Sequence, residues 1–330
     1  MQITNLRGSS YNTYTDCQWL YALLYDYNFH SYSGLKSTLG SVVHLALELL
    51  AKAKKCNHHI NQPQSKFLNP KYLLKVSWNR LINKQEPHVK KDKNYNKSVN
   101  KKFCLEQICT VLNTKFNPLL LEIIETELQF EIEIRKPGFQ TEFGDFLKIR
   151  GTIDLITKFD ENTIEVIDYK TGLRKDWNTG EVKEMEHLED DIQFLIYNLA
   201  IRTLFPQYPN INFTVFFTQE NKPISFAHSL EDTDLVLSKL RQRFIEIKNN
   251  DIPKRLKDDR KRYKEHFKCK YVCHFGKTKD QYGQSLCDKY HQMSNGQLYQ
   301  VSMREKSKEN LVVSKRNNYS NNRIYRAVIQ

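Results

Sequence analysis

The chain has 330 residues, with 51 Lys and Arg against 38 Asp and Glu, a formal net charge of +13 and a pI near 9.2. This length is sufficient for a real hydrophobic core, and 39% hydrophobic and 12% aromatic residues exclude a disordered chain. No stretch approaches the roughly 18 uninterrupted apolar residues of a membrane span. The first residues also lack the apolar segment of a secretory signal, so we expect a cytoplasmic protein without a membrane partner.

The positive charge is concentrated in three windows. Residues 84–102 and 301–330 each hold 7 Lys and Arg against 2 Asp and Glu, and residues 241–280 hold 14 against 6. Together these windows carry a net charge of +18, so the rest of the chain carries −5. A mildly acidic body with basic attachments suits an enzyme that binds a metal with carboxylates and a phosphate backbone with cations. A solvated basic surface without a partner is the alternative.

The first third of the chain is predicted to be helical. Residues 10–29 and 38–54 carry apolar side chains at helical spacing. Residues 56–102 are polar, basic and rich in Asn and Lys, which indicates an insertion or flexible connector with a helix near 70–83. A further helix is predicted at 103–124.

After this region the apolar period changes from helical to alternating. The stretch 127–135 alternates as ELQFEIEIR, and 146–157 and 163–169 are two further strands joined by the polar turn FDENT. The remaining predicted elements are a helix at 188–204, strands at 211–218 and 224–229, and a helix at 231–249. This order describes an α/β core covered by helices.

Two acidic residues and a lysine lie within the predicted strand pair. Asp154 lies in TIDLI, and Asp168 and Lys170 lie at the end of IEVIDYK, where residues two apart face the same side. A hairpin would bring Asp154 beside them, and two carboxylates with the Tyr169 carbonyl would form an oxygen site for Mg²⁺. The lysine would hold the scissile phosphate or orient the attacking water. An ordinary exposed hairpin with an incidental acid–lysine pair is the alternative.

Two helical pairs accompany this motif. His44 and Glu48 are four residues apart and share a helix face, and so do Gln193 and Tyr197 on the helix after the lysine strand. Each pair alone is more often structural or superficial than functional.

In this order, the motifs resemble the RecB-like exonuclease branch of the PD-(D/E)xK nuclease superfamily. That branch has a glycine before a helical histidine, then G-x-x-D, an acid-x-lysine and Q-x-x-x-Y. The corresponding residues here are Gly40 and His44, Gly151 to Asp154, Asp168 to Lys170, and Gln193 and Tyr197. The resemblance covers most of residues 10–290.

The resemblance implies a role for each matched residue. His44, Asp154 and Asp168 would bind Mg²⁺ or Mn²⁺, and Lys170 would be catalytic with the two aspartates. Gln193 and Tyr197 would shape the site and contact DNA, and a role for Glu48 is less strongly implied.

The resemblance also implies the fold class and domain organisation. We expect a restriction-endonuclease-like α/β core, a mixed central sheet flanked by helices, with N-terminal helices and a cysteine-containing C-terminal extension. Residues 1–55 would form the N-terminal helical part of the nuclease domain, 56–102 a polar basic insertion, 103–250 the nuclease core, and 251–330 the basic C-terminal segment.

Four cysteines lie near the two ends of the chain, Cys17 at one and Cys269, Cys273 and Cys287 at the other. This layout resembles the iron–sulfur nucleases of CRISPR-associated and helicase–nuclease systems, which implies a [4Fe–4S] cluster. The spacing departs from theirs, because thirteen residues separate Cys273 from Cys287. A zinc site without Cys17 competes with the cluster, because the pattern C-x₃-C-x₁₃-C-x₃-H, ending at His291, is close to zinc-finger spacing. Unliganded thiols are the third possibility.

We therefore predict a metal-dependent DNA nuclease, an exonuclease by resemblance, acting on single-stranded or duplex ends in replication, recombination or repair. A helicase or recombination protein is the expected partner. The Lys-, Asn-, Ile- and Tyr-rich composition is typical of an AT-rich genome, such as that of a phage. The alternative is a non-catalytic nucleic-acid-binding or assembly protein with a zinc module on a nuclease-like fold.

Overall fold

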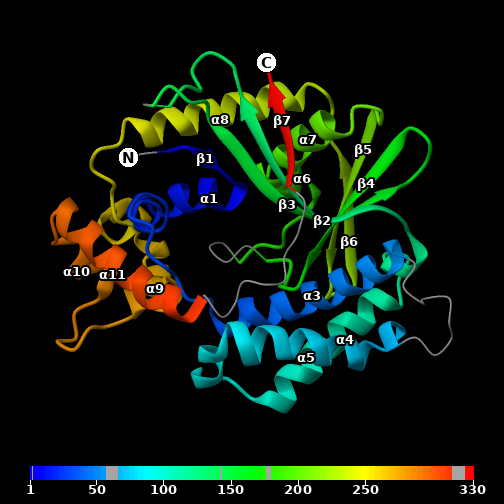
Figure 1. Cartoon of the computed structure of the whole chain (residues 1–330), viewed down its shortest axis with the longest axis horizontal. Coiled ribbons are helices and arrows are strands. Elements are labelled where there is room, and N and C mark those ends of the chain that lie inside the picture. Colours follow the sequence, from blue (N-terminus) through cyan, green and yellow to red (C-terminus); the bar gives the residue numbers. More distant parts are fainter. Residues whose placement is uncertain (2, 57–65, 142, 176–179, 314–323) are drawn as a thin grey trace.

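The computed structural model describes the chain except residues 2, 57–65, 142, 176–179 and 314–323. Its centre is a mixed sheet with the strand order β6-β5-β4-β3-β2-β7, and the short strand β1 pairs with β3 (Figure 1). Neighbours β2–β3, β3–β4 and β5–β6 are antiparallel, whereas β4–β5, β2–β7 and β1–β3 are parallel. The described strands are β1 (Asn5–Leu6), β2 (Glu122–Ile134), β3 (Lys148–Lys158), β4 (Thr163–Lys170), β5 (Asn210–Phe217), β6 (Lys222–Ala227) and β7 (Ile324–Ile329).

Helices cover both faces of this sheet. One layer contains α3, α4 and α5, and the opposite layer contains α1, α7 and α8 (Figure 1). The larger described helices are α1 (Gly8–Asp16), α3 (Leu35–Lys55), α4 (Pro70–Trp78), α5 (Lys97–Leu112), α7 (Ile192–Leu204), α8 (Asp232–Lys248) and α11 (Asn295–Val313). The shorter ones include α2 (Gln18–Tyr21), α6 (Met185–Glu189), α9 (His274–Lys277) and α10 (Leu286–His291). No described helix is long and apolar enough to cross a membrane.

The alternating pattern of β2 explains how the sheet buries its core. Leu128, Phe130, Ile132 and Ile134 are all at most 2% exposed, and they face the layer of α7 and α8. Alternate residues of a strand point to opposite faces, so this regular alternation commits one face of β2 to the core. The strands predicted at 127–135, 146–157 and 163–169 are confirmed in type and order.

Two predicted helices have different bounds in the structure. The helix expected at 10–29 is broken at Cys17, whose backbone is extended between α1 and α2. The helix expected at 103–124 ends at Leu112, because the apolar run near 119–124 leads into strand β2 instead. In both places the apolar spacing continued across a change of element, which periodicity alone does not reveal.

Residues 56–102 were predicted to be an insertion or a flexible connector, and the flexible connector is wrong for the described central part. Helix α4 continues into a π-helical turn, η3 (Asn79–Gln85), and both pack against α3 and α5 through buried side chains. Leu73, Trp78 and Ile82 are each at most 1% exposed. Residues 57–65 lie outside the described residues. The helix expected near 70–83 is confirmed, and it belongs to the hydrophobic core.

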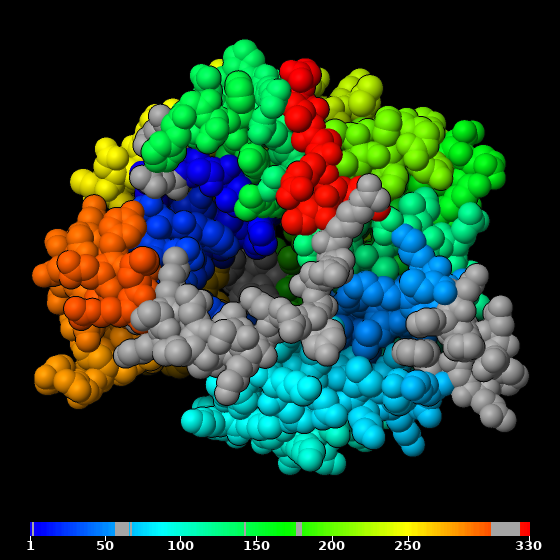
Figure 2. Space-filling view, viewed as in Figure 1, coloured from blue at the N-terminus to red at the C-terminus, as the bar shows by residue number. Residues whose placement is uncertain are grey.

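The two ends of the chain form a third packed group beside the sheet. Trp19, Leu23 and Phe29 pack with Phe275 and other residues of the C-terminal segment. Figure 2 shows this segment, coloured orange, directly against the N-terminal residues, coloured blue. The sequence indicated no element after 249, so α9, α10, α11 and β7 are additions from the structure.

Candidate active site

The acidic residues of β3 and β4 meet where the two strands stop pairing. The antiparallel ladder runs from Lys158 opposite Ile164 to Leu155 opposite Ile167. One further step in this register places Asp154 opposite Asp168. Instead of continuing the ladder, the Tyr169 amide donates a hydrogen bond to Asp154 Oδ2 at 3.1 Å. The hairpin predicted from the sequence therefore brings both aspartates together, and the strands separate at this point.

A third carboxylate, Glu127, was not predicted from the sequence. With Asp154 and Asp168 it forms a row of acidic side chains across β2, β3 and β4, called the acidic row below. In the β2–β3 ladder, Thr126 pairs with Leu155 and Leu128 with Ile153, so Glu127 lies opposite Asp154. Its φ of 48° lies in the left-handed region, which is strained for a residue with a side chain and is often associated with functional sites. The sequence contained no signal for it, because the long connection between β2 and β3 leaves their register open.

His44 approaches the row from α3. Its Nδ1 lies 3.2 Å from Asp154 Oδ2. Gly40, one helical turn earlier, allows this approach, because a Cβ there would lie 2.6 Å from the Thr171 hydroxyl oxygen after β4. Ligand atoms of His44, Glu127 and Asp154 all lie within 4.8 Å of one another, a spacing that no other group of three His, Cys, Asp or Glu reaches in the described part of the chain.

Asp168 and Lys170 are held from the other side by α7. Lys170 Nζ lies 2.8 Å from Asp168 Oδ2. Gln193 Nε2 donates to Asp168 Oδ1 at 2.9 Å, and Lys170 Nζ donates to Gln193 Oε1 at 3.3 Å. Gln193 Nε2 also donates to the Tyr197 hydroxyl at 2.9 Å, and that hydroxyl donates to the Thr152 carbonyl at 2.5 Å. Since Tyr197 is only 7% exposed, this geometry favours a site-shaping position over a direct contact with DNA.

The electrostatics of the row reflect burial and crowding of like charges. Burial opposes the charged form of His44. The charge of Asp154 and its hydrogen bond with the imidazole outweigh burial and raise the pKa of His44 to about 9. Burial, together with the charges of Asp154 and Glu48, raises the pKa of Glu127 to about 8. Burial also raises the pKa of Asp168, although Lys170 opposes the shift. The pKa of Asp154 is lowered, because the interactions with His44 outweigh burial.

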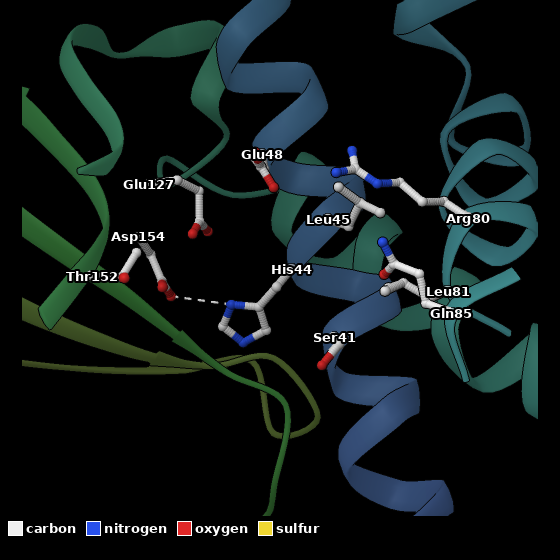
Figure 3. Close-up of a pocket in the computed structure, with 10 residues that line it drawn as sticks. All are labelled: Ser41, His44, Leu45, Glu48, Arg80, Leu81, Gln85, Glu127, Thr152 and Asp154. Atoms are coloured by element: carbon white, nitrogen blue, oxygen red, sulfur yellow. Dashed lines mark ion pairs between the residues drawn. The ribbon is translucent and has the colours of Figure 1, made fainter. Parts of the chain in front are cut away.

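His44, Glu127 and Asp154 line one cleft between the sheet and the helical layer (Figure 3), whereas Asp168 and Lys170 are not among its lining residues. Its cavity volume is about 490 Å³. Glu48 also lies on its wall and forms an ion pair with Lys52 at 2.5 Å. The lining residues are Ser41, His44, Leu45, Glu48, Arg80, Leu81, Gln85, Glu127, Thr152 and Asp154.

The donor set fits a divalent metal ion. Carboxylate oxygens suit Mg²⁺ and Mn²⁺, and an imidazole suits the softer Mn²⁺. Asp168 Oδ2 is fully buried and accepts no hydrogen bond from a described residue beyond its ion pair with Lys170. Each oxygen of an ionised carboxylate has about two lone-pair sites, so the pairing with Lys170 leaves Asp168 Oδ2 able to accept a metal ion as well.

The four cysteines near the chain ends line a second cavity of about 580 Å³. Cys17 separates α1 from α2, Cys269 lies in a π-helical turn at Lys268–Val272, Cys273 precedes α9, and Cys287 lies in α10. The layout predicted from the sequence is therefore present. Burial, reinforced by the neighbouring cysteines, raises the pKa of Cys269 to about 11 and that of Cys287 to about 12.

Backbone amides donate hydrogen bonds to the sulfurs of Cys17 and Cys273. Cys17 Sγ accepts hydrogen bonds from the amides of Leu20 and Leu256, each at 3.4 Å. Two amides of α9 also donate to the Cys273 sulfur and oppose the effect of burial on its pKa. Amide hydrogen bonds to cysteine sulfurs stabilise thiolate charge, and they are one of the means by which proteins tune iron–sulfur centres.

The zinc alternative would use Cys269, Cys273, Cys287 and His291. Tetrahedral ligands at a Zn–S distance of about 2.3 Å place sulfurs about 3.8 Å apart. Among the described residues, neither these four ligands nor the four cysteines form a group of three within 4.8 Å. His291 instead packs edge-on against Trp19, with ring centroids 5.2 Å apart.

Comparison with known families shows which superfamily the chain matches. The family model described as the PD-(D/E)XK nuclease superfamily matches residues 8–277. The chain belongs to the PD-(D/E)XK nuclease superfamily. The predicted fold class, a restriction-endonuclease-like mixed sheet flanked by helices, is confirmed.

The chain is also similar to two solved structures. A crystal structure of a candidate exonuclease from Eubacterium rectale has a TM-score of 0.44 and 12% identity, covering 78% of this chain and 87% of that one. The structure of SSO0001 has a TM-score of 0.30 and 20% identity, covering 72% of this chain and 97% of that one. No curated protein matches the chain significantly.

Proposed function

We propose that this protein is a metal-dependent nuclease that hydrolyses phosphodiester bonds in DNA. The observation that carries the proposal is the meeting of Asp154, Asp168 and Lys170 at the point where β3 and β4 separate. Carboxylates in this arrangement suit a metal ion, and a lysine beside them suits a phosphate. Membership of a nuclease superfamily supports the same reaction class.

The metal ion would be held by His44, Glu127, Asp154 and Asp168, with the Tyr169 carbonyl as a further predicted ligand. Such an ion supplies Lewis-acid polarisation of the phosphate and lowers the pKa of a bound water. Before it binds, His44 must lose the proton that it shares with Asp154, since only neutral imidazole is a ligand. Metal affinity should therefore rise with pH up to about 9.

Lys170 would stabilise the negative charge that develops on the phosphate oxygens. Its ammonium group is directed by both Asp168 and Gln193, so it is already oriented before substrate binds. Gln193 in turn is fixed by the hydroxyl of Tyr197. We assign Gln193 and Tyr197 as positioning residues.

The exposed cations of the basic C-terminal segment would bind the phosphate backbone without reading sequence. Several basic residues there are used internally, because Arg262 and Lys268 pair with Glu265 and Asp16. Within residues 254–279 the exposed basic residues are Lys254, Arg260, Lys261, Lys264, Lys270, Lys277 and Lys279. Exonuclease action, a role in replication, recombination or repair, a helicase partner, a cytoplasmic site and a phage source stay predictions from the sequence.

The test is digestion of end-labelled linear DNA and circular single-stranded DNA in the presence of Mn²⁺ or Mg²⁺. An exonuclease degrades the linear DNA, leaves the circle intact and stops when EDTA is added. RNA of the same sequence provides the control for substrate class. DNA binding without cleavage under all metal conditions would instead favour the non-catalytic alternative.

We also propose that Cys17, Cys269, Cys273 and Cys287 hold an iron–sulfur cluster. Support comes from four thiols around one cavity and from amides directed at the sulfurs of Cys17 and Cys273. The cluster would link the N-terminal helices to the C-terminal segment. Its ligands lie outside the cleft of the acidic row, which indicates a structural position.

A further inference from the structure

The π-helical turn η3, within the region assigned from the sequence to an insertion, forms one wall of the active-site cleft. Trp78 and Ile82, at most 1% exposed, anchor this turn to the core shared with α3 and α5. Arg80 lies between them in the chain, and residues two apart do not share a helix face. Arg80 and Gln85 consequently line the cleft, and Figure 3 shows both side chains extending toward α3. π-helical turns frequently occur at functional sites.

Arg80 is an unpaired cation in a cleft rich in acid. It is half-buried, and it makes no hydrogen bond or ion pair with any described residue. The other cationic group of the lining, His44, is already paired with Asp154. A partly desolvated guanidinium without a partner is costly, and its planar fork matches two oxygens of a phosphate.

A nucleic-acid strand entering this cleft meets the negative charges of Glu48, Glu127 and Asp154. Lys170 offsets charge on the sheet side, but it is committed to Asp168. We propose that Arg80 binds a backbone phosphate next to the scissile bond and holds the strand against the acidic row. This inference rests on the proposed nuclease function. It makes Arg80 the residue of the helical wall that binds substrate.

The test compares Arg80→Gln, Arg80→Lys and Lys84→Gln. Lys84 lies on the same turn but is exposed and outside the cleft lining, so Lys84→Gln removes the same charge without removing the contact. With a short single-stranded oligothymidylate and Mn²⁺, Arg80→Gln should raise KM about tenfold or more with a smaller change in kcat. Arg80→Lys should fall between wild type and Arg80→Gln, because lysine keeps the charge but not the fork. Lys84→Gln should stay within about twofold of wild type.

Binding in Ca²⁺, followed by fluorescence anisotropy against salt, gives a second readout. The slope of log affinity against log salt should be shallower by about 0.7 in Arg80→Gln, as expected for one lost single-strand phosphate contact. Melting temperatures of all variants should match that of wild type.

Three outcomes would overturn the inference. Equal KM values for Arg80→Gln and Lys84→Gln, with an active wild type, would refute the role of Arg80 and leave the nuclease proposal intact. A large drop in melting temperature with collapse of kcat would assign Arg80 a structural role. A wild type that neither binds nor cleaves the oligonucleotide would overturn the proposed function together with this inference.

Discussion

Asp154 is the residue on which the geometry of the site converges. Its Oδ2 accepts the Tyr169 amide and lies 3.2 Å from His44 Nδ1, and its register neighbours are Glu127 and Asp168. Three carboxylates in one row repel one another, which burial makes stronger. His44 and Lys170 offset part of this repulsion, and a divalent cation held by the row would offset more of it.

The role of Glu127 predicts a pH dependence of stability. In the metal-free folded state its pKa is about 8, against an ordinary value of 4.5. Between these values the folded state holds a proton that the unfolded state has lost, so this group makes the free energy of unfolding fall as pH rises. Glu127→Gln should match wild type near pH 4.5 and exceed it near pH 8 in urea unfolding with EDTA. If the free energies of unfolding of the two proteins changed with pH in parallel over this range, the environment described for Glu127 would be contradicted.

The same variant separates stability from metal binding. If Glu127 is a ligand, Mn²⁺ should raise the melting temperature of wild type more than that of Glu127→Gln, because a ligand that binds only the folded state stabilises it. Glu133→Gln on the same strand is the control, since Glu133 pairs with Arg135 and lies outside the cleft. If Mn²⁺ raised the melting temperature of Glu127→Gln as much as that of wild type, Glu127 would not be a metal ligand.

At the level of elements, two glycines set how closely the helix and the strands approach. Gly40 brings α3 to the end of β4, and Gly151 leaves room on β3 for the ring of Phe130 on β2. A Cβ at Gly151 would lie 2.5 Å from that ring. Phe130 in turn packs edge-on against Tyr197, with ring centroids 6.3 Å apart. Tyr197 in turn accepts a hydrogen bond from Gln193. The packing of Gly151 against Phe130 therefore influences the orientation of Gln193 through Tyr197.

Gly151→Ala should therefore destabilise the protein by about 1–3 kcal/mol, the usual cost of overpacking a core. Cleavage should also slow, because a displaced Phe130 shifts Tyr197. Denaturant unfolding and cleavage rates check both effects. Gly296→Ala, where a Cβ meets open space, is the matched control. Wild-type stability in Gly151→Ala would show that the strands relax without affecting the site.

The elements differ in how far they could be predicted. Strands β3 and β4 followed from their apolar alternation and a polar turn, and the pairing of Asp154 with Asp168 followed from that hairpin. Glu127 could not be found, because nothing local fixes the register of β2. The core role of α4 was hidden by polar surroundings, although Leu73 and Trp78 are buried. Strand β7 owes its place to pairing with β2, a contact about 195 residues distant in sequence that local patterns do not encode.

At the scale of the whole molecule, the two chain ends are fastened together beside the nuclease core. Polar contacts contribute, since Lys268 pairs with Asp16 at 2.8 Å and the Trp19 amide donates to the Lys254 carbonyl at 3.1 Å. Aromatic packing adds to them, with Phe29 stacked on Tyr290 at 4.6 Å. A cluster bridging Cys17 and the C-terminal cysteines would close a loop of some 250 residues, which stabilises by a few kcal/mol in the chain-entropy account.

The cysteine proposal predicts brown protein that contains iron and sulfide after anaerobic purification. Cys17→Ser should bleach the colour and make the C-terminal segment more sensitive to proteolysis, whereas His291→Ala should keep the iron. Metal analysis of the three proteins checks this. Colourless protein with stoichiometric zinc, retained in Cys17→Ser and lost in His291→Ala, would establish the zinc site instead.

The central claim is that the acidic row on β2, β3 and β4 is the catalytic centre of a nuclease. The most direct measurement is the rate of cleavage of end-labelled DNA by Asp154→Asn with Mn²⁺. Asparagine keeps the size of the side chain and an oxygen for the Tyr169 amide, but it removes the charge beside His44. We predict that cleavage falls by at least about a hundredfold while DNA binding is retained, and that Asp234→Asn, an exposed site on α8, leaves the rate unchanged. Cleavage by Asp154→Asn at close to the wild-type rate would contradict the account.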